Sequence, residues 1–190
     1  MTPAAMTPTE ELVREHGDIL VMLQIVGEMV RRLEAGEPVD PDHLENAVDF
    51  IRNYADKYHH AKEEDFLFPA MEEAGVPGEG GPIGVMLAEH DEGRGYVRTA
   101  AEAIDAYRGG DAAAGKTIAA NLRNYAGLLE GHISKENQVL YPIADARIGE
   151  SGQRELRWAF DHVGKKPEMI EHRDRCQGIL TELYPIYIGE

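Results

Sequence analysis

Apolar residues recur every three or four positions along four long segments of this chain, which is the spacing of one buried face of an α-helix. The segments cover about residues 9–35, 40–74, 82–108 and 111–147. Glycine, proline and aspartate residues fill the short intervals between them. Short connections between long amphipathic helices favour antiparallel neighbours. The pattern therefore predicts an all-α fold, an antiparallel up-down-up-down four-helix bundle.

Local signals mark where two of these helices begin. Thr9 is followed by acidic residues, which predicts that it caps the first helix. Asp40 is followed by Pro41, a pair typical of a helix cap and the first helical position.

The chain divides into three parts. Residues 1–8 are predicted to be a flexible N-terminus, residues 9–147 the bundle, and residues 148–190 an extension of two shorter helices. About 40 residues bury too little apolar surface to be stable alone. We therefore expect the extension to pack on the bundle.

Composition narrows the classes of partner. The chain has 190 residues, of which 43% are hydrophobic, and a formal net charge of −16. Such a charge argues against binding to nucleic acid, because the phosphate backbone is bound mainly by lysine and arginine side chains. Cys176 is the only cysteine, so neither an intrachain disulfide nor a thiolate cluster can form. The oligomeric state is not indicated.

The N-terminal residues have neither a basic start nor an apolar run, so we expect no signal peptide and a cytoplasmic location. The longest apolar stretch, about residues 19–26, is too short to span a bilayer. No membrane association is expected.

A duplicated motif is the most informative feature. Residues 59–69 read HHAKEEDFLFP and residues 132–142 read HISKENQVLYP, so that six positions agree at an offset of 73. The first and third segments repeat a Glu-His pair, at residues 15–16 and 89–90, at an offset of 74. The four helices therefore amount to two helix pairs of one pattern.

A histidine and a glutamate four residues apart lie on the same face of a helix, within reach of one metal ion. At about 100° per residue, His59 and Glu63 lie on or beside the apolar stripe of their helix. His60 is placed toward water and Glu64 at the edge. His60 and Glu64 are also four residues apart, but the repeat favours the first pair.

Six side chains are thus predicted to point into one apolar interior. Two buried carboxylates without a counter-charge would be strongly unfavourable, and Lys62 and Lys135 lie off the inward face. A bound multivalent cation removes the objection, and imidazole with carboxylate suits iron, manganese or zinc. Two carboxylates that can each bridge favour a dinuclear site. The predicted metal ligands are His16, His59, Glu63, His90, His132 and Glu136.

Neighbouring residues admit more than one interpretation. A single inward histidine is more often a hydrogen-bonded core residue than a ligand. Arg94 lies one turn after His90, where it would hold an exogenous anion, pair with an inward glutamate, or reach the surface. Glu64 and His60 are further candidates for contacts with the ligands or an anion. Glu15 and Glu89 would either orient ligands or be solvated.

The motif resembles the hemerythrin superfamily, specifically its HHE cation-binding branch, over roughly residues 9–147. The resemblance implies a non-haem di-iron centre with an oxo or hydroxo bridge. A ferritin-like bundle, which carries Glu-x-x-His motifs, matches less well. The chain differs from the oxygen carriers of the family. Met86 and Arg94 stand one turn from His90, and Glu136 stands where carriers have aspartate.

The leading hypothesis is a di-iron protein that binds or senses oxygen, peroxide or nitric oxide, or that handles iron. The partner would be a small diatomic or peroxide ligand. One alternative is a di-iron enzyme of the peroxidase or nitric oxide reductase type. Another is a passive zinc- or manganese-binding module. Peroxide turnover and the metal content of the purified protein distinguish the three hypotheses.

Overall fold

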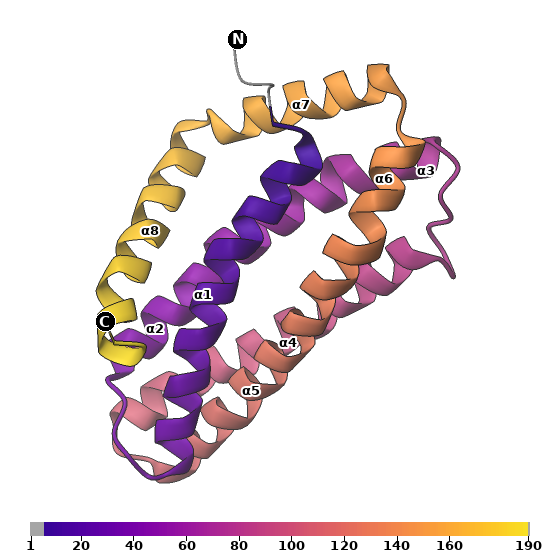
Figure 1. Ribbon diagram of the computed structural model, residues 1–190. Coiled ribbons are helices and arrows are strands. Elements are labelled where there is room, and N and C mark those ends of the chain that lie inside the picture. The colour runs from indigo at the N-terminus through magenta and orange to yellow at the C-terminus, as the bar shows by residue number, and fades with distance from the viewer. Residues whose placement is uncertain (1–5, 190) are drawn as a thin grey trace.

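The computed structural model describes residues 6–189, and every element within this range is helical. The first long helix is α1 (Pro8–Glu34) and the third is α4 (Pro82–Arg108). The second is continuous through α2 (Pro41–Phe50), η1 (Ile51–His60), η2 (Glu63–Leu67) and α3 (Phe68–Glu73). The fourth comprises α5 (Ala112–Lys135), η3 (Glu136–Leu140) and α6 (Tyr141–Arg147). The all-α prediction is confirmed, and Figure 1 shows these helices side by side.

The first helix begins two residues earlier than the sequence predicts. The Thr7 hydroxyl accepts a hydrogen bond from the Glu10 amide, and the Glu10 carboxylate accepts one from the Thr7 amide. This reciprocal capping box satisfies two amides at the helix start. Thr9 instead donates to Asp145. Pro8, the last residue of the predicted N-terminal segment, is already helical, and residues 1–5 of that segment lie outside the described residues.

Both motif helices contain π-helical segments, in which hydrogen bonds run from residue i+5 to residue i. The Phe68 amide donates to the Glu63 carbonyl, and the Tyr141 amide donates to the Glu136 carbonyl. Pro69 follows one segment and Pro142 follows the other. A proline has no amide hydrogen and its ring crowds the carbonyl four residues before it, so a wider turn at this point relieves both problems.

The buried side chains form two hydrophobic clusters with a polar layer between them. Along α1, Leu12 belongs to one cluster, Ile19 belongs to the other, and His16 lies between them. Along the fourth helix, Ile133 and Leu140 flank Glu136 in the same way. Every long helix therefore places its candidate ligand at the same level of the bundle.

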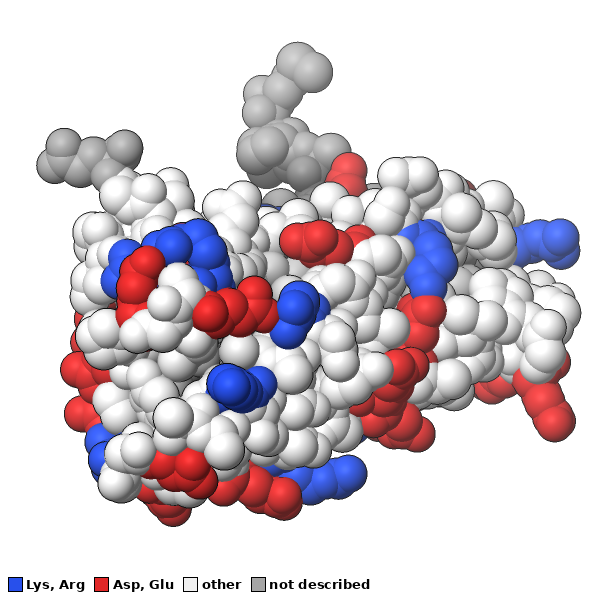
Figure 2. Space-filling view, turned by 90° about the horizontal axis from the view of Figure 1, so that it is seen from below, with Lys and Arg blue, Asp and Glu red and all other residues white. Residues whose placement is uncertain are grey.

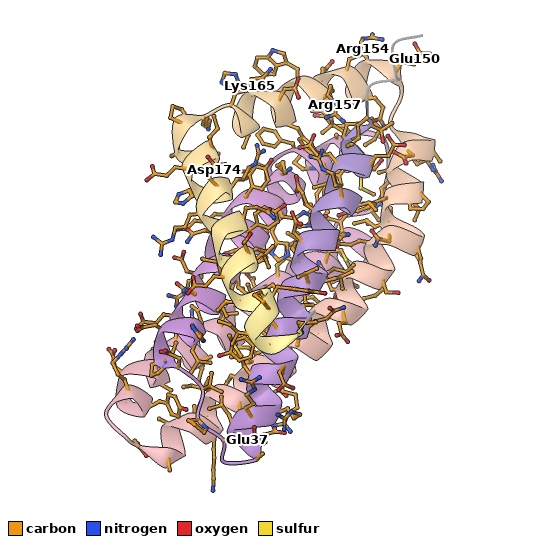
Figure 3. The ribbon with its side chains drawn as sticks, turned by 60° about the vertical axis from the view of Figure 1, so that its left-hand side comes forward. Glu37, Glu150, Arg154, Arg157, Lys165 and Asp174 are labelled. Atoms are coloured by element: carbon orange, nitrogen blue, oxygen red, sulfur yellow. The ribbon has the colours of Figure 1, made fainter. Side chains whose placement is uncertain are left out.

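The C-terminal helices are α7 (Glu150–Gly164) and α8 (Pro167–Tyr187). Figure 1 shows α7 across one end of the bundle and α8 running back beside α1 and α2. Phe160 joins one hydrophobic cluster and Leu183 joins the other. Arg157, labelled in Figure 3, donates to Glu11 over 2.7 Å. Both helices thus contribute to the interior of the bundle.

Charged side chains of both signs are interspersed on the face shown in Figure 2. None of the described helices is long and apolar enough to cross a membrane.

Replacing Leu183 with alanine tests how strongly α8 is attached. Leu183 is fully buried, so Leu183→Ala should lower the free energy of unfolding by about 2–5 kcal/mol through lost burial and a cavity. Ile186, on the same helix, is 43% exposed, and Ile186→Ala should stay within about 0.5 kcal/mol of the parent protein. Urea unfolding followed by circular dichroism measures both values. Equal effects would show that α8 does not depend on the buried contact.

Candidate metal centre

The first histidine pair joins α1 to the second long helix. His16 Nε2 and His59 Nε2 lie 3.0 Å apart. The other nitrogen of each ring has its own acceptor: His59 Nδ1 lies 3.0 Å from a Glu15 oxygen, and His16 Nδ1 lies 2.9 Å from Asn137 Oδ1. Because these oxygens only accept, each Nδ1 carries the hydrogen. In the neutral rings, the facing Nε2 atoms therefore carry lone pairs.

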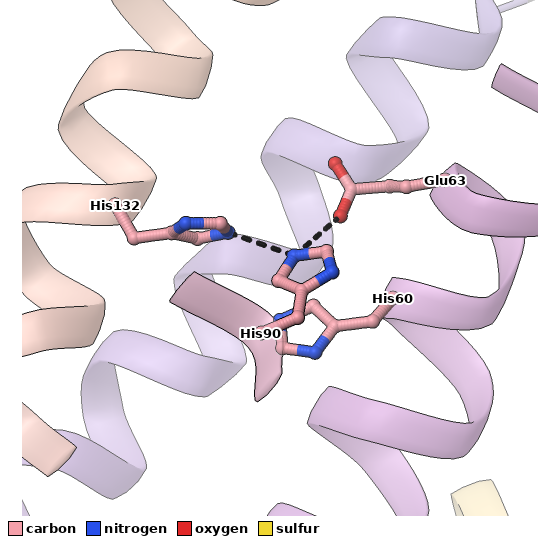
Figure 4. Close-up of side chains that lie close together, drawn as sticks. All are labelled: His60, Glu63, His90 and His132. Atoms are coloured by element: carbon pink, nitrogen blue, oxygen red, sulfur yellow. Dashed lines mark hydrogen bonds and ion pairs between the residues drawn. The ribbon is translucent and has the colours of Figure 1, made fainter. Parts of the chain in front are cut away.

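The second histidine pair repeats this geometry between α4 and α5. His90 Nε2 and His132 Nε2 lie 3.0 Å apart. His90 Nδ1 donates to Glu64 over 2.6 Å, and His132 Nδ1 donates to Glu89 over 2.9 Å. Such outer hydrogen bonds fix the tautomer and ring orientation that metal-binding histidines need. Figure 4 shows the second pair with Glu63 beside it.

Two fully buried carboxylates lie between the pairs. Glu136 directs one oxygen to His16, 3.1 Å away, and the other to His132, 3.0 Å away. One oxygen of Glu63 lies 3.9 Å from His59 Nε2 and 3.6 Å from His90 Nε2. Both carboxylates therefore reach from one histidine pair to the other.

The donor set fits two cations. Imidazole lone pairs 3.0 Å apart repel each other unless a proton or a cation lies between them. One oxygen of Glu63 and both oxygens of Glu136 are buried without a hydrogen-bond donor. Buried carboxylates in this state require neutralisation. Nitrogen and oxygen donors without thiolate suit iron, manganese or zinc. The structure brings the six predicted ligands together, with one histidine pair on each side of the two carboxylates.

In the metal-free protein, protons supply part of that neutralisation. Burial and the negative charge of Glu136 raise the pKa of Glu63 well above its usual value. Burial also acts to raise the pKa of Glu136, but its interactions with the adjacent His132 and His16 rings outweigh burial and hold that pKa well below the usual value. Burial opposes protonation of His132, whereas Glu136 and Glu89 favour it, and its pKa is raised. Metal ions and protons thus compete for the same atoms.

The prediction that His60 faces water is wrong. His60 is buried, with its ring stacked 3.8 Å from that of His90 at an angle of 16°. A ligand nitrogen of His60 also lies near Glu63, His90 and His132. The error has a physical source, since residues 51–60 are π-helical and the assumed rotation per residue is too large for them. Burial lowers the pKa of His60 to about 4.

Arg94 lies beside the centre, but its partners differ from the predicted ones. Its guanidinium donates to Asp56, Glu64 and Asp91 and contacts neither Glu63 nor Glu136. Glu64 in turn accepts from His90, and the His90 hydrogen bond lowers the Glu64 pKa. Arg94 therefore holds the carboxylate that orients the His90 ring.

Lys62 was predicted to lie off the inward face, yet it is fully buried. Its ammonium pairs with Glu15 and, over 3.0 Å, with Glu11. Burial raises the pKa of Glu15 to about 7, although Lys62 opposes the shift. The corresponding Lys135 pairs with Glu89 near the surface. Both lysines thus hold the acceptor of a candidate ligand histidine, and neither neutralises the inward carboxylates.

Two contacts were not found by sequence reasoning. Asn137 holds His16 and occupies the repeat position of Glu64. The Tyr141 hydroxyl donates to Glu63 over 2.6 Å, whereas its repeat partner is Phe68. The only feature of the sequence that pointed to these contacts is the difference in polarity between the two repeat partners at each of these positions.

Residues 7–144 match the family described as Hemerythrin HHE cation binding domain. This match covers most of the chain and both copies of the motif. The chain belongs to this family. Its four histidines and two glutamates thus form the candidate cation site of a hemerythrin HHE domain.

Curated relatives agree with this assignment. Uncharacterised proteins of Mycobacterium tuberculosis and Mycobacterium bovis are 31% identical over 137 residues, which are 72% of this chain and 53% of each relative. The iron-sulfur cluster repair protein YtfE of Edwardsiella ictaluri is 31% identical over 144 residues, 69% of this chain and 60% of that protein. The chain spans little more than half the length of these relatives. No solved structure matches it significantly.

Replacing Glu63 with glutamine tests the electrostatics of the metal-free centre. Glu63 is a carboxyl group whose pKa is raised on folding. Such a group contributes stability that is present at pH values below its ordinary pKa. This stability is lost as the pH rises toward the pKa of the group in the folded protein. Metal-free Glu63→Gln should therefore be more stable than the parent protein above pH about 5. Between the ordinary pKa and the raised pKa of Glu63, the difference in free energy of unfolding should grow by roughly 1.4 kcal/mol per pH unit. Thermal melts between pH 5 and 8 measure the difference.

Glu136→Gln is the matched control. The pKa of Glu136 is lowered on folding, so its ionised form contributes stability above the ordinary glutamate value. Metal-free Glu136→Gln should therefore melt below the parent protein at neutral pH. If both substitutions shifted the melting temperature in the same direction, the unequal proton sharing described above would be wrong.

Proposed function

We propose that this hemerythrin HHE domain is a non-haem di-iron protein that binds oxygen, peroxide or nitric oxide. The observation that carries the proposal is the bridging geometry of Glu136, one oxygen toward each histidine pair. A pair of irons would supply redox-active sites with open coordination positions for a small ligand. The YtfE relative is named for iron-sulfur cluster repair, which supports an iron-related role.

Each protein group has a definite task in this proposal. His16 and His59 would bind one iron, His90 and His132 the other, and Glu63 and Glu136 both. The outer carboxylates hold the rings in the binding tautomer. The proposal retains an antiparallel up-down-up-down bundle and a cytoplasmic location, with a small molecule as partner. Turnover of peroxide or nitric oxide by the loaded protein would favour the enzyme alternative over a binding protein.

Metal analysis tests the proposal directly. Protein reconstituted anaerobically with ferrous iron and then oxidised should contain about two irons per chain, because the donors form two pairs. Near-ultraviolet charge-transfer bands from an oxo or hydroxo bridge should accompany them. Zinc or manganese in their place would support the passive module, and well under one metal per chain would contradict the dinuclear centre.

Alanine substitution of adjacent histidines tests the ligand assignment. His59→Ala should lose at least one iron, because it removes one nitrogen of a facing pair. His60→Ala should retain both irons. An imidazole binds metal in its ring plane, so two rings stacked 3.8 Å apart at 16° cannot both direct a lone pair at one ion. Iron content and the visible spectrum measure both variants. Loss of iron from His60→Ala would make His60 a seventh ligand.

A further inference from the structure

Tyr141 lies beside the first histidine pair, with its hydroxyl oxygen close to two candidate ligand atoms. The oxygen lies 2.6 Å from Glu63 Oε1 and 3.3 Å from His16 Nε2. The side chain is only 2% exposed, and its ring stacks on that of His16, with centroids 5.6 Å apart at an angle of 10°. Packing therefore fixes the position of this hydroxyl group among the ligands.

One hydrogen cannot satisfy both neighbours of the Tyr141 oxygen. The phenolic hydrogen is donated to Glu63, because that contact is much the shorter of the two. The hydrogen of the neutral His16 ring is on Nδ1, where Asn137 accepts it, so Nε2 carries a lone pair and has nothing to donate. Two lone-pair atoms then face each other over 3.3 Å, as in the two histidine pairs. A cation bound to both atoms relieves this repulsion.

The distances between the donor atoms around the first pair fit one coordination sphere. Neighbouring ligand atoms of an octahedral ion with bonds of about 2.1 Å are roughly 3 Å apart. His16 Nε2 lies 3.0 Å from its partner nitrogen in the pair and 3.1 Å from the nearer oxygen of Glu136. The Tyr141 oxygen, 3.3 Å from the same nitrogen, is almost as close as these predicted ligands.

The first pair also has fewer carboxylate oxygens near it than the second pair. Glu63 Oε2 faces His90 Nε2 at 3.6 Å, as Figure 4 shows, and lies 3.9 Å from His59 Nε2. The compact group of donors around the first pair therefore contains a single carboxylate, that of Glu136, beside its two histidines. The hydroxyl of Tyr141 supplies a further oxygen donor on this side.

The internal repeat shows that this donor is specific to one side. Phe68 is the repeat partner of Tyr141, and its ring stacks on that of His90, with centroids 6.1 Å apart at an angle of 20°. Each motif thus places an aromatic ring on the histidine of a neighbouring long helix. The second motif adds a hydroxyl group to that ring. The packing is shared by both halves, and the oxygen donor is the difference.

We propose that Tyr141 binds, as a tyrosinate, the iron held by His16 and His59. The proposal rests on the proposed di-iron function and adds a ligand to one of the two irons. On binding, the O–H bond of the phenol is exchanged for an O–Fe bond, and one proton is released. Tyrosine oxygen serves as a ligand of iron in other proteins. Because it is an anionic donor, it stabilises the ferric state of this iron over the ferrous state.

The visible spectrum of the oxidised protein tests the proposal. The iron content is measured first, since well under two irons per chain would contradict the proposed function. Protein that holds both irons should show a phenolate-to-iron charge-transfer band in the visible, in addition to the near-ultraviolet bands of the bridge. Tyr141→Phe should lose the visible band and keep the near-ultraviolet bands. Absence of the visible band from parent protein that holds both irons would refute the tyrosinate ligand and leave the proposed function intact.

Resonance Raman spectroscopy of the parent protein identifies the ligand even if Tyr141→Phe retains no iron. Excitation in the visible band should enhance phenolate ring vibrations. These vibrations should shift when ring-deuterated tyrosine is incorporated. A visible band without enhanced phenolate vibrations would contradict the proposal.

The reduction potential separates a ligand from a residue that only donates a hydrogen bond. Loss of an anionic ligand destabilises the ferric state, so Tyr141→Phe should raise the potential of one iron. If Tyr141 only donated to Glu63, its removal would make that carboxylate a stronger donor and lower the potential. A lowered potential in Tyr141→Phe would therefore overturn the proposal.

Tyr54→Phe and Tyr125→Phe are the matched controls. Both tyrosines are buried in the bundle, but the Tyr54 hydroxyl donates to Asp18, and Tyr125 lies beside the second histidine pair. Both variants should keep the visible band and the parent potential. If the band disappeared in either control and persisted in Tyr141→Phe, another tyrosine would be the ligand and the proposal would be wrong.

Discussion

Four hydrogen bonds from histidine Nδ1 atoms to fixed oxygen acceptors determine the chemistry of this bundle. Each bond places the hydrogen on the outer nitrogen and turns the lone pair of Nε2 inward. Without them, the rings would be free to donate to Glu63 and Glu136, and the carboxylates would need no cation. The acceptors come from neighbouring helices, so the orientation of the ligands depends on the packing of the whole bundle.

Placing this polar layer between two hydrophobic clusters has an energetic reason. Six ionisable groups in one layer are unfavourable to bury, and apolar packing on both sides holds them in place. The same packing excludes water, which strengthens every electrostatic interaction within the layer. Protons or cations must then balance the charge, and this links metal affinity, pH and stability in one set of atoms.

Duplication accounts for the symmetry of the ligands, and substitutions within the repeat account for the differences between the two halves. Tyr141 in place of Phe68 adds a donor to Glu63. Gly93 in place of Ile19 leaves space beside one histidine pair. The C-terminal helix α7 adds a further asymmetry, because Phe160 covers the buried Lys62. A nearly symmetric centre thus has a cavity beside its second histidine pair.

The four helices, the duplicated motif and the inward placement of the six candidate ligands followed from the sequence, because helical periodicity and an internal repeat are local properties. The position of His60 did not follow, since residues 51–60 form a π-helix whose rotation per residue differs from the assumed value. The burial of Lys62 and the partners of Arg94 also required the structure. These features depend on which side chains of different helices contact each other. They could not be predicted, because the spacing of residues along one helix carries no information about the distance from that helix to its neighbours.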